Sequence, residues 1–190
     1  MPTDALVPPI LTPRLRLESM SLQFMRALVA RDLDAATREL DAALPADLPD
    51  QLEHFLQFRL AQLDGDPSIQ RWLGRAMVLT DDAGARRLIG TIGFHGPPDD
   101  AGRLEVGYRV EPEHRRQGYA REAVRALFEW AAEQGVRRFV ASVSPTNEPS
   151  LQLVRSFGFR ETGSHMDEID GLELELEARW PEPIGDAGLA

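Results

Sequence analysis

The chain has 190 residues, no cysteine and a formal net charge of −10, and its length fits one domain with a core of its own. Without cysteine it has no disulfide, thiolate metal site or cysteine nucleophile, and because all 21 basic residues are arginine it also lacks the lysine of a Walker-type phosphate loop or a Schiff base. The acidic balance argues against a nucleic acid partner, and no apolar run approaches the roughly 20 residues of a membrane helix.

Apolar residues in the first third of the chain predict one strand followed by three helices. Leu15 and Leu17 alternate with polar residues, which is typical of a strand with one buried face. Ser19 or Ser21 can cap a helix, since apolar residues recur at helical spacing after them. Pro45 and Pro49 are expected to end the second helix before the third begins. The expected elements are a strand at residues 11–18 and helices beginning at 21, 32 and 50.

The apolar period changes to two from about residue 75, which predicts three strands with short links in an antiparallel meander. A helix that starts near Tyr119 and ends at Gly135 follows. The short strand after it makes a parallel crossover the expected connection. Asn147 can cap a further helix. The expected strands lie at residues 75–80, 88–95, 104–110, 139–143 and 172–178.

The loop at residues 115–120 joins a strand to the start of a helix. The first amides of a helix have no partner inside it, and the helix dipole places partial positive charge there. A phosphate is therefore a natural ligand. Gly118 lets bare amides approach an anion, and Arg115 and Arg116 add positive charge. We predict that this loop holds the pyrophosphate of a cofactor.

Four stretches of the chain together resemble the GNAT superfamily of acyl-CoA N-acyltransferases, in the branch that includes enzymes acetylating the N-termini of ribosomal proteins. The match runs in order from residue 11 to about 180. The stretches are Leu11-Thr12-x-Arg14-Leu15-x-Leu17, residues 104–112 with Gly107-Tyr108, Arg115-x-x-Gly118-x-Ala120, and Asn147-x-x-Ser150 followed by Gly158-Phe159.

The resemblance implies an α+β fold with a twisted, mostly antiparallel sheet of about seven strands, flanked by helices. The sheet would be splayed between its fourth and fifth strands, where acetyl-CoA would lie as cosubstrate without any metal. One domain would cover residues 11–180, with flexible ends at 1–10 and 181–190. The implied cofactor-binding residues are Val110, Arg115, Arg116, Gln117, Gly118, Tyr119, Ala120 and Asn147.

Acetyl transfer needs a neutral amine, yet an amine with a pKa of about 10.4 is almost fully protonated at neutral pH. Glu105 can accept this proton directly or through water; the alternative is an ordinary solvent-facing strand residue. The resemblance places Ser150 near the CoA sulfur as a proton donor to the leaving thiolate, although it can also serve its helix alone. Asn147 likewise can be only a cap. Val154 replaces the tyrosine that many relatives use as the acid.

The four histidines lack metal-binding spacing, and His95 ends a strand where it could border the substrate pocket. A dinucleotide-dependent oxidoreductase is disfavoured, because the loop has one glycine and follows a meander. The N-terminus shows no secretory signal, so a cytoplasmic protein without membrane partners is expected.

We therefore predict an N-acetyltransferase that moves an acetyl group from acetyl-CoA to a primary amine by direct attack in a ternary complex. The acceptor, a protein N-terminus or a small molecule, stays open, and the acidic charge favours a cation weakly. A homodimer is one oligomeric state that relatives adopt. The alternative function is a non-catalytic acyl-CoA-binding sensor or scaffold of the same fold.

Overall fold

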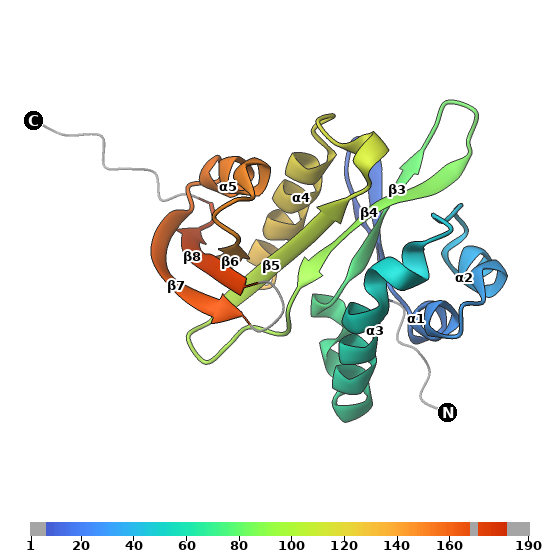
Figure 1. Ribbon diagram of the computed structural model, residues 1–190, viewed down its shortest axis with the longest axis horizontal. Helices are drawn as coiled ribbons and strands as arrows, with labels where there is room; N and C mark the ends of the chain where they lie inside the picture. Colours follow the sequence, from blue (N-terminus) through green and yellow to red (C-terminus); the bar gives the residue numbers. More distant parts are fainter. Residues whose placement is uncertain (1–6, 168–170, 182–190) are drawn as a thin grey trace, which may run out of the picture. The chain divides into compact units, whose positions relative to one another are not determined.

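A computed structural model describes residues 7–167 and 171–181 of the chain. The chain forms two compact units of two segments each (Figure 1): unit 1 contains Met1–Gly93 and Tyr108–Ala126, and unit 2 contains Phe94–Gly107 and Leu127–Ala190. Of the ends expected to be flexible, residues 1–6 and 182–190 lie outside the described residues, whereas Ile10 begins a strand.

Unit 1 packs helices on a group of antiparallel strands. Leu15 and Leu17 of β2 are buried. The helical residues Phe24, Leu28 and Leu56 also belong to the buried apolar core. Its strands are β1 (Ile10–Leu11), β2 (Leu15–Ser19), β3 (Arg75–Thr80) and most of β4 (Arg86–Phe94). Its first helices are α1 (Leu22–Val29), α2 (Leu33–Leu40), α3 (Leu48–Gly65) and the 3-10 helix η1 (Pro67–Trp72).

The local signals explain where these helices begin. The Ser21 hydroxyl accepts the amide of Phe24 at 3.0 Å, so Ser21 is the N-cap of α1, and Ser19, the other candidate, ends β2. The expected break at Pro49 is wrong, because α3 begins at Leu48 and carries this proline in its first turn. Proline is tolerated there, since the amide it lacks would have no partner inside the helix.

Unit 2 is built around a cluster of aromatic rings. Phe128 stacks on Phe139 with ring centroids 4.1 Å apart, and Phe157, Phe159 and Trp180 surround it within 6.1 Å. Aromatic pairs of this kind contribute beyond the apolar area they bury. The elements of this unit include β6 (Arg138–Val143), α5 (Glu148–Arg155), β7 (Arg160–Asp167) and β8 (Gly171–Arg179).

The strands form an eight-stranded sheet in the order β1-β2-β3-β4-β5-β6-β8-β7. Neighbouring strands are mostly antiparallel, and β5 (Arg103–Val110) pairs in parallel with β6, which confirms the predicted α+β class and the crossover. Eight strands replace the expected seven or so because a turn after Thr12 separates β1 from β2. The crossover helix is α4 (Tyr119–Glu133), preceded by the 3-10 helix η2 (Pro112–His114).

The parallel ladder between β5 and β6 is short. It covers only Arg103 to Glu105 of β5, paired with residues 138–140 of β6, although β6 continues to Val143. An early end to this ladder is the feature expected of a sheet that is splayed after its fourth long strand. Glu105 stands at the last paired position.

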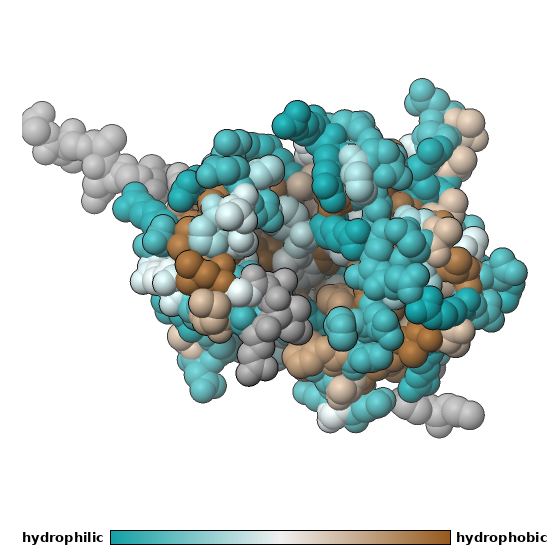
Figure 2. Space-filling model, viewed as in Figure 1, coloured by the Kyte–Doolittle hydropathy of each residue, from teal (hydrophilic) through white to brown (hydrophobic). Residues whose placement is uncertain are grey.

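The face of the molecule in Figure 2 is covered mainly by hydrophilic residues, as the 27% content of charged residues predicts. No helix in the described ranges is long and apolar enough to cross a membrane.

Candidate active site

The loop predicted to bind pyrophosphate lies in unit 1 between η2 and α4. Gly118 has a φ of +83° and Arg116 a φ of +60°. This left-handed region is easy for glycine and unfavourable for arginine, so the loop holds one strained residue. Among the described residues, a Cβ on Gly118 would meet only the Arg14 guanidinium, at 3.4 Å. The surface of the loop is therefore open.

The amides at the start of α4 are available to a ligand. The amide of Glu122 donates to the carbonyl of Gly118 at 3.0 Å, which closes the first turn. In the part of the chain that the structure describes, no group accepts a hydrogen bond from the amides of Gly118, Tyr119 or Ala120. These three amides at the positive end of the helix dipole suit an anion of phosphate size.

Side chains at the predicted loop positions mainly shape the loop itself. The Arg115 Nε donates to the Val110 carbonyl at 2.9 Å and so ties the loop to the end of β5. The Gln117 side chain donates to the Glu113 carbonyl at 3.1 Å. Arg116 is exposed. Tyr119 is buried beneath the loop with 9% of its surface exposed. The amides of Gly118, Tyr119 and Ala120, more than these side chains, are thus the groups that the loop leaves without an acceptor in the described chain.

Arg14, expected inside the first strand, lies between β1 and β2 and joins this loop from the N-terminal segment. Its Nη1 donates to the Gln117 carbonyl at 3.0 Å, and its guanidinium lies 4.4 Å from the centre of the Tyr119 ring. Its Nε forms an ion pair with Glu122 at 2.7 Å. A contact between residues 108 positions apart has no local signal in the sequence, although the Thr-x-Arg pattern of the family resemblance contains this residue.

Glu122 completes a clasp, by which we mean the contacts among Thr12, Arg14, Gln117 and Glu122. The Glu122 carboxylate accepts the Thr12 hydroxyl at 2.5 Å and the Arg14 amide at 2.8 Å. Burial by itself would raise the pKa of Glu122, but hydrogen bonds from Thr12 and Arg14 outweigh it, so the pKa is lowered. The clasp thus keeps a charged carboxylate on the first turn of α4 and fixes the loop on one side.

Replacing Arg14 with glutamine is expected to raise the Kd for CoA by about 10-fold, because the loop loses one charge-assisted contact to its backbone. Isothermal titration with CoA measures this effect. Arg16→Gln is the matched control, since Arg16 also pairs through its Nε, with Glu18 at 2.8 Å, and its side chain is equally exposed at 44%. Equal CoA affinities in the two variants would contradict a role for the clasp.

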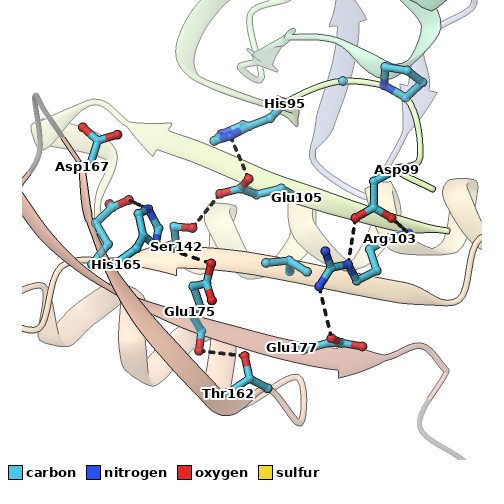
Figure 3. Close-up of a pocket in the computed structure, with 14 residues that line it drawn as sticks. His95, Asp99, Arg103, Glu105, Ser142, Thr162, His165, Asp167, Glu175 and Glu177 are labelled. Atoms are coloured by element: carbon cyan, nitrogen blue, oxygen red, sulfur yellow. Dashed lines mark hydrogen bonds and ion pairs between the residues drawn. The ribbon is translucent and has the colours of Figure 1, made fainter. Parts of the chain in front are cut away.

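The second feature is a cavity of about 720 Å³ that lies entirely within unit 2 (Figure 3). Strands β5, β6, β7 and β8 and the segment after β4 supply its walls. Its lining includes six carboxylates and one guanidinium, so negative charge dominates. The charged and titratable lining residues are His95, Asp99, Arg103, Glu105, His165, Asp167, Glu173, Glu175 and Glu177.

Glu105 lies at the centre of a hydrogen-bonded group in this cavity. Its Oε1 accepts the Ser142 hydroxyl at 2.7 Å, and its Oε2 lies 3.4 Å from the Nδ1 of His95. The hydrogen bond with His95 is the largest cause that lowers the pKa of Glu105, burial opposes it, and Ser142 adds to the lowering. Glu105 is therefore a charged carboxylate in this cavity and a weak proton acceptor by itself.

The remaining charges of the cavity are partly paired. Arg103 contacts Asp99 at 2.8 Å and Glu177 at 4.0 Å, whereas His165 faces Glu173 at 3.7 Å and Glu175 at 3.5 Å. The single guanidinium thus lies at one end of the cavity, as Figure 3 shows. Within the described residues, the acidic and histidine side chains form no group of three that could hold a metal ion.

The structure places the second predicted pair of site residues on α5. The Asn147 side chain accepts the amide of Ser150 at 3.3 Å, as an N-cap does. Neither residue lines the acidic cavity in which Glu105 lies. Val154 is 2% exposed in the core, where it packs as the sequence pattern predicts and offers no acid.

A family model and a related protein both indicate an acetyltransferase. A family model described as an acetyltransferase (GNAT) domain matches residues 14–160. The chain is 30% identical over 153 residues to YjdG of Bacillus subtilis, an uncharacterised N-acetyltransferase, and the match covers 78% of this chain and 87% of that protein.

Solved structures share the fold. An acetyltransferase from Agrobacterium tumefaciens is 26% identical with a TM-score of 0.59, over 90% of this chain and 94% of that one. A putative ribosomal-protein-serine acetyltransferase from Vibrio cholerae is 18% identical with a TM-score of 0.61, over 90% of this chain and 97% of that one.

Proposed function

Since this chain belongs to the GNAT acetyltransferase family and is an acetyl-CoA-dependent acetyltransferase, we propose that it acetylates a primary amine by direct attack in a ternary complex. The observation that carries the proposal is the acidic cavity around Glu105. We propose further that both units belong to one catalytic domain, because the family match at residues 14–160 includes parts of both. The cytoplasmic location expected from the N-terminus is part of the same proposal.

The loop of unit 1 is proposed to bind the pyrophosphate of CoA. Three amides without a partner in the described chain and the open surface above Gly118 support this role. Arg115 contributes by fixing the loop to Val110, and Arg116 is exposed for a phosphate contact. The proposed cofactor-binding residues are Val110, Arg115, Arg116, Gln117, Gly118, Tyr119, Ala120 and Asn147.

The cavity of unit 2 is proposed to receive the amine. An excess of carboxylates favours an acceptor with more than one positive charge, because each ammonium gains attraction in a partly enclosed space. Glu105 assists the removal of a proton from the attacking ammonium. Ser150 is proposed to protonate the departing thiolate, a role supported by its place on the first turn of α5.

The alternative, a non-catalytic acyl-CoA-binding protein of the same fold, is disfavoured by the acetyltransferase family match. Its one support is the buried Val154, which offers no acid where the family resemblance implies a tyrosine in many relatives. The two candidates differ in one measurable property, which is the release of CoA thiol in the presence of an amine.

A thiol-release assay with acetyl-CoA tests the function. The panel contains peptides with free N-termini, a diamine, a polyamine, an aminoglycoside and a monoamine with no other charge. We expect thiol release with multiply charged acceptors, and a KM for them that rises with salt because screening weakens the attraction. Tight CoA binding without acetylation of any panel member would favour the scaffold instead.

A further inference from the structure

His95 and Glu105 form a pair held by backbone hydrogen bonding between neighbouring segments. The amide of His95 donates to the carbonyl of Glu105 at 2.9 Å, so the two side chains leave the sheet beside each other. Their side chains approach to 3.4 Å between Nδ1 and Oε2, as Figure 3 shows. The hydroxyl of Ser142 holds the other carboxylate oxygen at 2.7 Å.

The absence of a side chain at Gly107 leaves room for the His95 imidazole. A Cβ at this position would lie 2.9 Å from the Nε2 of His95. The ring therefore extends along β5 from Glu105 to Gly107, with Nδ1 toward the carboxylate and Nε2 over the glycine. A larger residue at position 107 would push the ring away from this position.

Exposure separates the two members of the pair. The His95 side chain is 52% exposed and that of Glu105 33%, and both line the cavity. An incoming amine therefore reaches the imidazole more easily than the carboxylate, which Ser142 already occupies on one oxygen.

We propose that His95 is the residue that takes the proton from the acceptor ammonium, and that Glu105 acts as the positioning residue that orients the imidazole. This inference deepens the proposed function and rests on it. It also gives Glu105 a definite part in assisting deprotonation: the carboxylate fixes the ring through Nδ1 and offsets the charge that the imidazole acquires.

His95 accepts one proton from the ammonium and leaves a neutral amine, whose lone pair attacks the thioester carbonyl. The C–N bond forms and the C–S bond breaks with its electron pair on sulfur. The thiolate takes up a proton, the amide nitrogen loses one, and the proton on His95 leaves to solvent through its exposed side.

The charged groups that line the cavity with His95 come from the segment after β4 and from β5, β7 and β8, whereas β6 contributes Val140 and Ser142. Most of these charged groups are carboxylates, and Arg103 is the one guanidinium among the described lining residues. The groups are Asp99 in the segment after β4, Arg103 and Glu105 on β5, His165 and Asp167 on β7, and Glu173, Glu175 and Glu177 on β8.

The pH dependence of kcat/KM tests the inference with an amine that the wild type acetylates. If an imidazole accepts the proton, the acid limb of kcat/KM belongs to His95, and the alkaline limb follows the amine at about pH 10. His95→Gln is expected to lower kcat on the order of 10²-fold to 10⁴-fold and to remove the acid limb. Glu105→Gln is expected to lower kcat while retaining that limb, because the imidazole is still present.

The opposite pattern would overturn the inference. If Glu105 accepts the proton itself, the acid limb of kcat/KM lies below the ordinary glutamate pKa of about 4.3. In that case Glu105→Gln removes the acid limb, and His95→Gln retains it. His54→Gln, at an exposed position of α3, is the control and leaves rate and profile unchanged. Acetylation by the wild type is measured first. If the wild type acetylates the amine but the variants contradict the roles of His95 and Glu105, only this inference fails. If the wild type acetylates no amine, the proposed function fails.

Gly107→Ala provides an independent test that removes no titratable group. Its methyl would displace the imidazole, and the nearest obstruction is a side chain rather than backbone. We expect kcat to fall at least about 10-fold, with the Kd for CoA and the melting temperature close to those of the wild type. An unchanged kcat would contradict the placement of His95.

Discussion

Replacing Gly118 with valine is expected to raise the Kd for CoA by about 100-fold, which corresponds to the loss of one or two charge-assisted hydrogen bonds. Gly118 has a φ of +83°, a conformation that a β-branched residue adopts only under strain. Relief of that strain would rotate the peptide groups next to it. The amides of Gly118, Tyr119 and Ala120 would then no longer point to one ligand.

Gly84→Val is the matched control for this variant. Gly84 has the same φ of +83°, lies in the turn between β3 and β4, and has nothing within 4 Å of its ideal Cβ. Both variants are therefore expected to lose about 1–3 kcal/mol of unfolding free energy through strain. Only Gly118→Val should lose CoA affinity. Titration calorimetry and thermal melts measure the two quantities, and equal CoA affinities would remove the loop from the binding site.

Replacing Gly90 with alanine is expected to destabilise the protein by about 3 kcal/mol. A Cβ there would lie 2.2 Å from the Arg109 carbonyl oxygen and 3.1 Å from the Cα of Val110. These are backbone atoms, so β4 and β5 must separate locally to admit the methyl group. At about 2–4 °C per kcal/mol for a chain of this size, the melting temperature falls by about 6–12 °C.

The same change should weaken CoA binding, because Val110 anchors the loop through the Nε of Arg115. Gly65→Ala is its control: Gly65 is the last residue of α3 and has nothing within 4 Å of its ideal Cβ. That control should change the unfolding free energy by no more than about 0.5 kcal/mol. Equal melting temperatures for the two alanine variants would show that β4 and β5 tolerate separation at this position.

Several features could be read from short stretches of sequence because they depend on neighbouring residues. The strand-loop-helix order around Gly118, the caps at Ser21 and Asn147, and the apolar stripe of α4 are local properties of the backbone. The expectation of a phosphate loop needed only the geometry of a helix start. Together with the spacing of four motifs, these local properties predicted the α+β GNAT fold, which the strand order and the fold comparisons confirm.

The partners of Glu105 could not be predicted in this way. Its contact with Ser142 joins residues 37 positions apart, and its contact with His95 depends on how the end of β4 pairs with β5. A shift of one residue in strand register would turn these side chains to opposite faces. The residue pattern alone therefore indicates Glu105 as a candidate, and it places His95 only at the end of the neighbouring strand.

By itself, the sequence determined the elements, the loop that presents bare amides, and the family, because each is encoded in residues close along the chain or in their order. Only the tertiary structure decided that Arg14 contacts Glu122, which lies 108 positions later in the chain, and so holds the loop. Only the tertiary structure brought carboxylates of β5, β7 and β8 around one cavity. Such groupings arise from strand pairing across long chain separations. Their energies depend on distance and burial, which residue order alone does not specify.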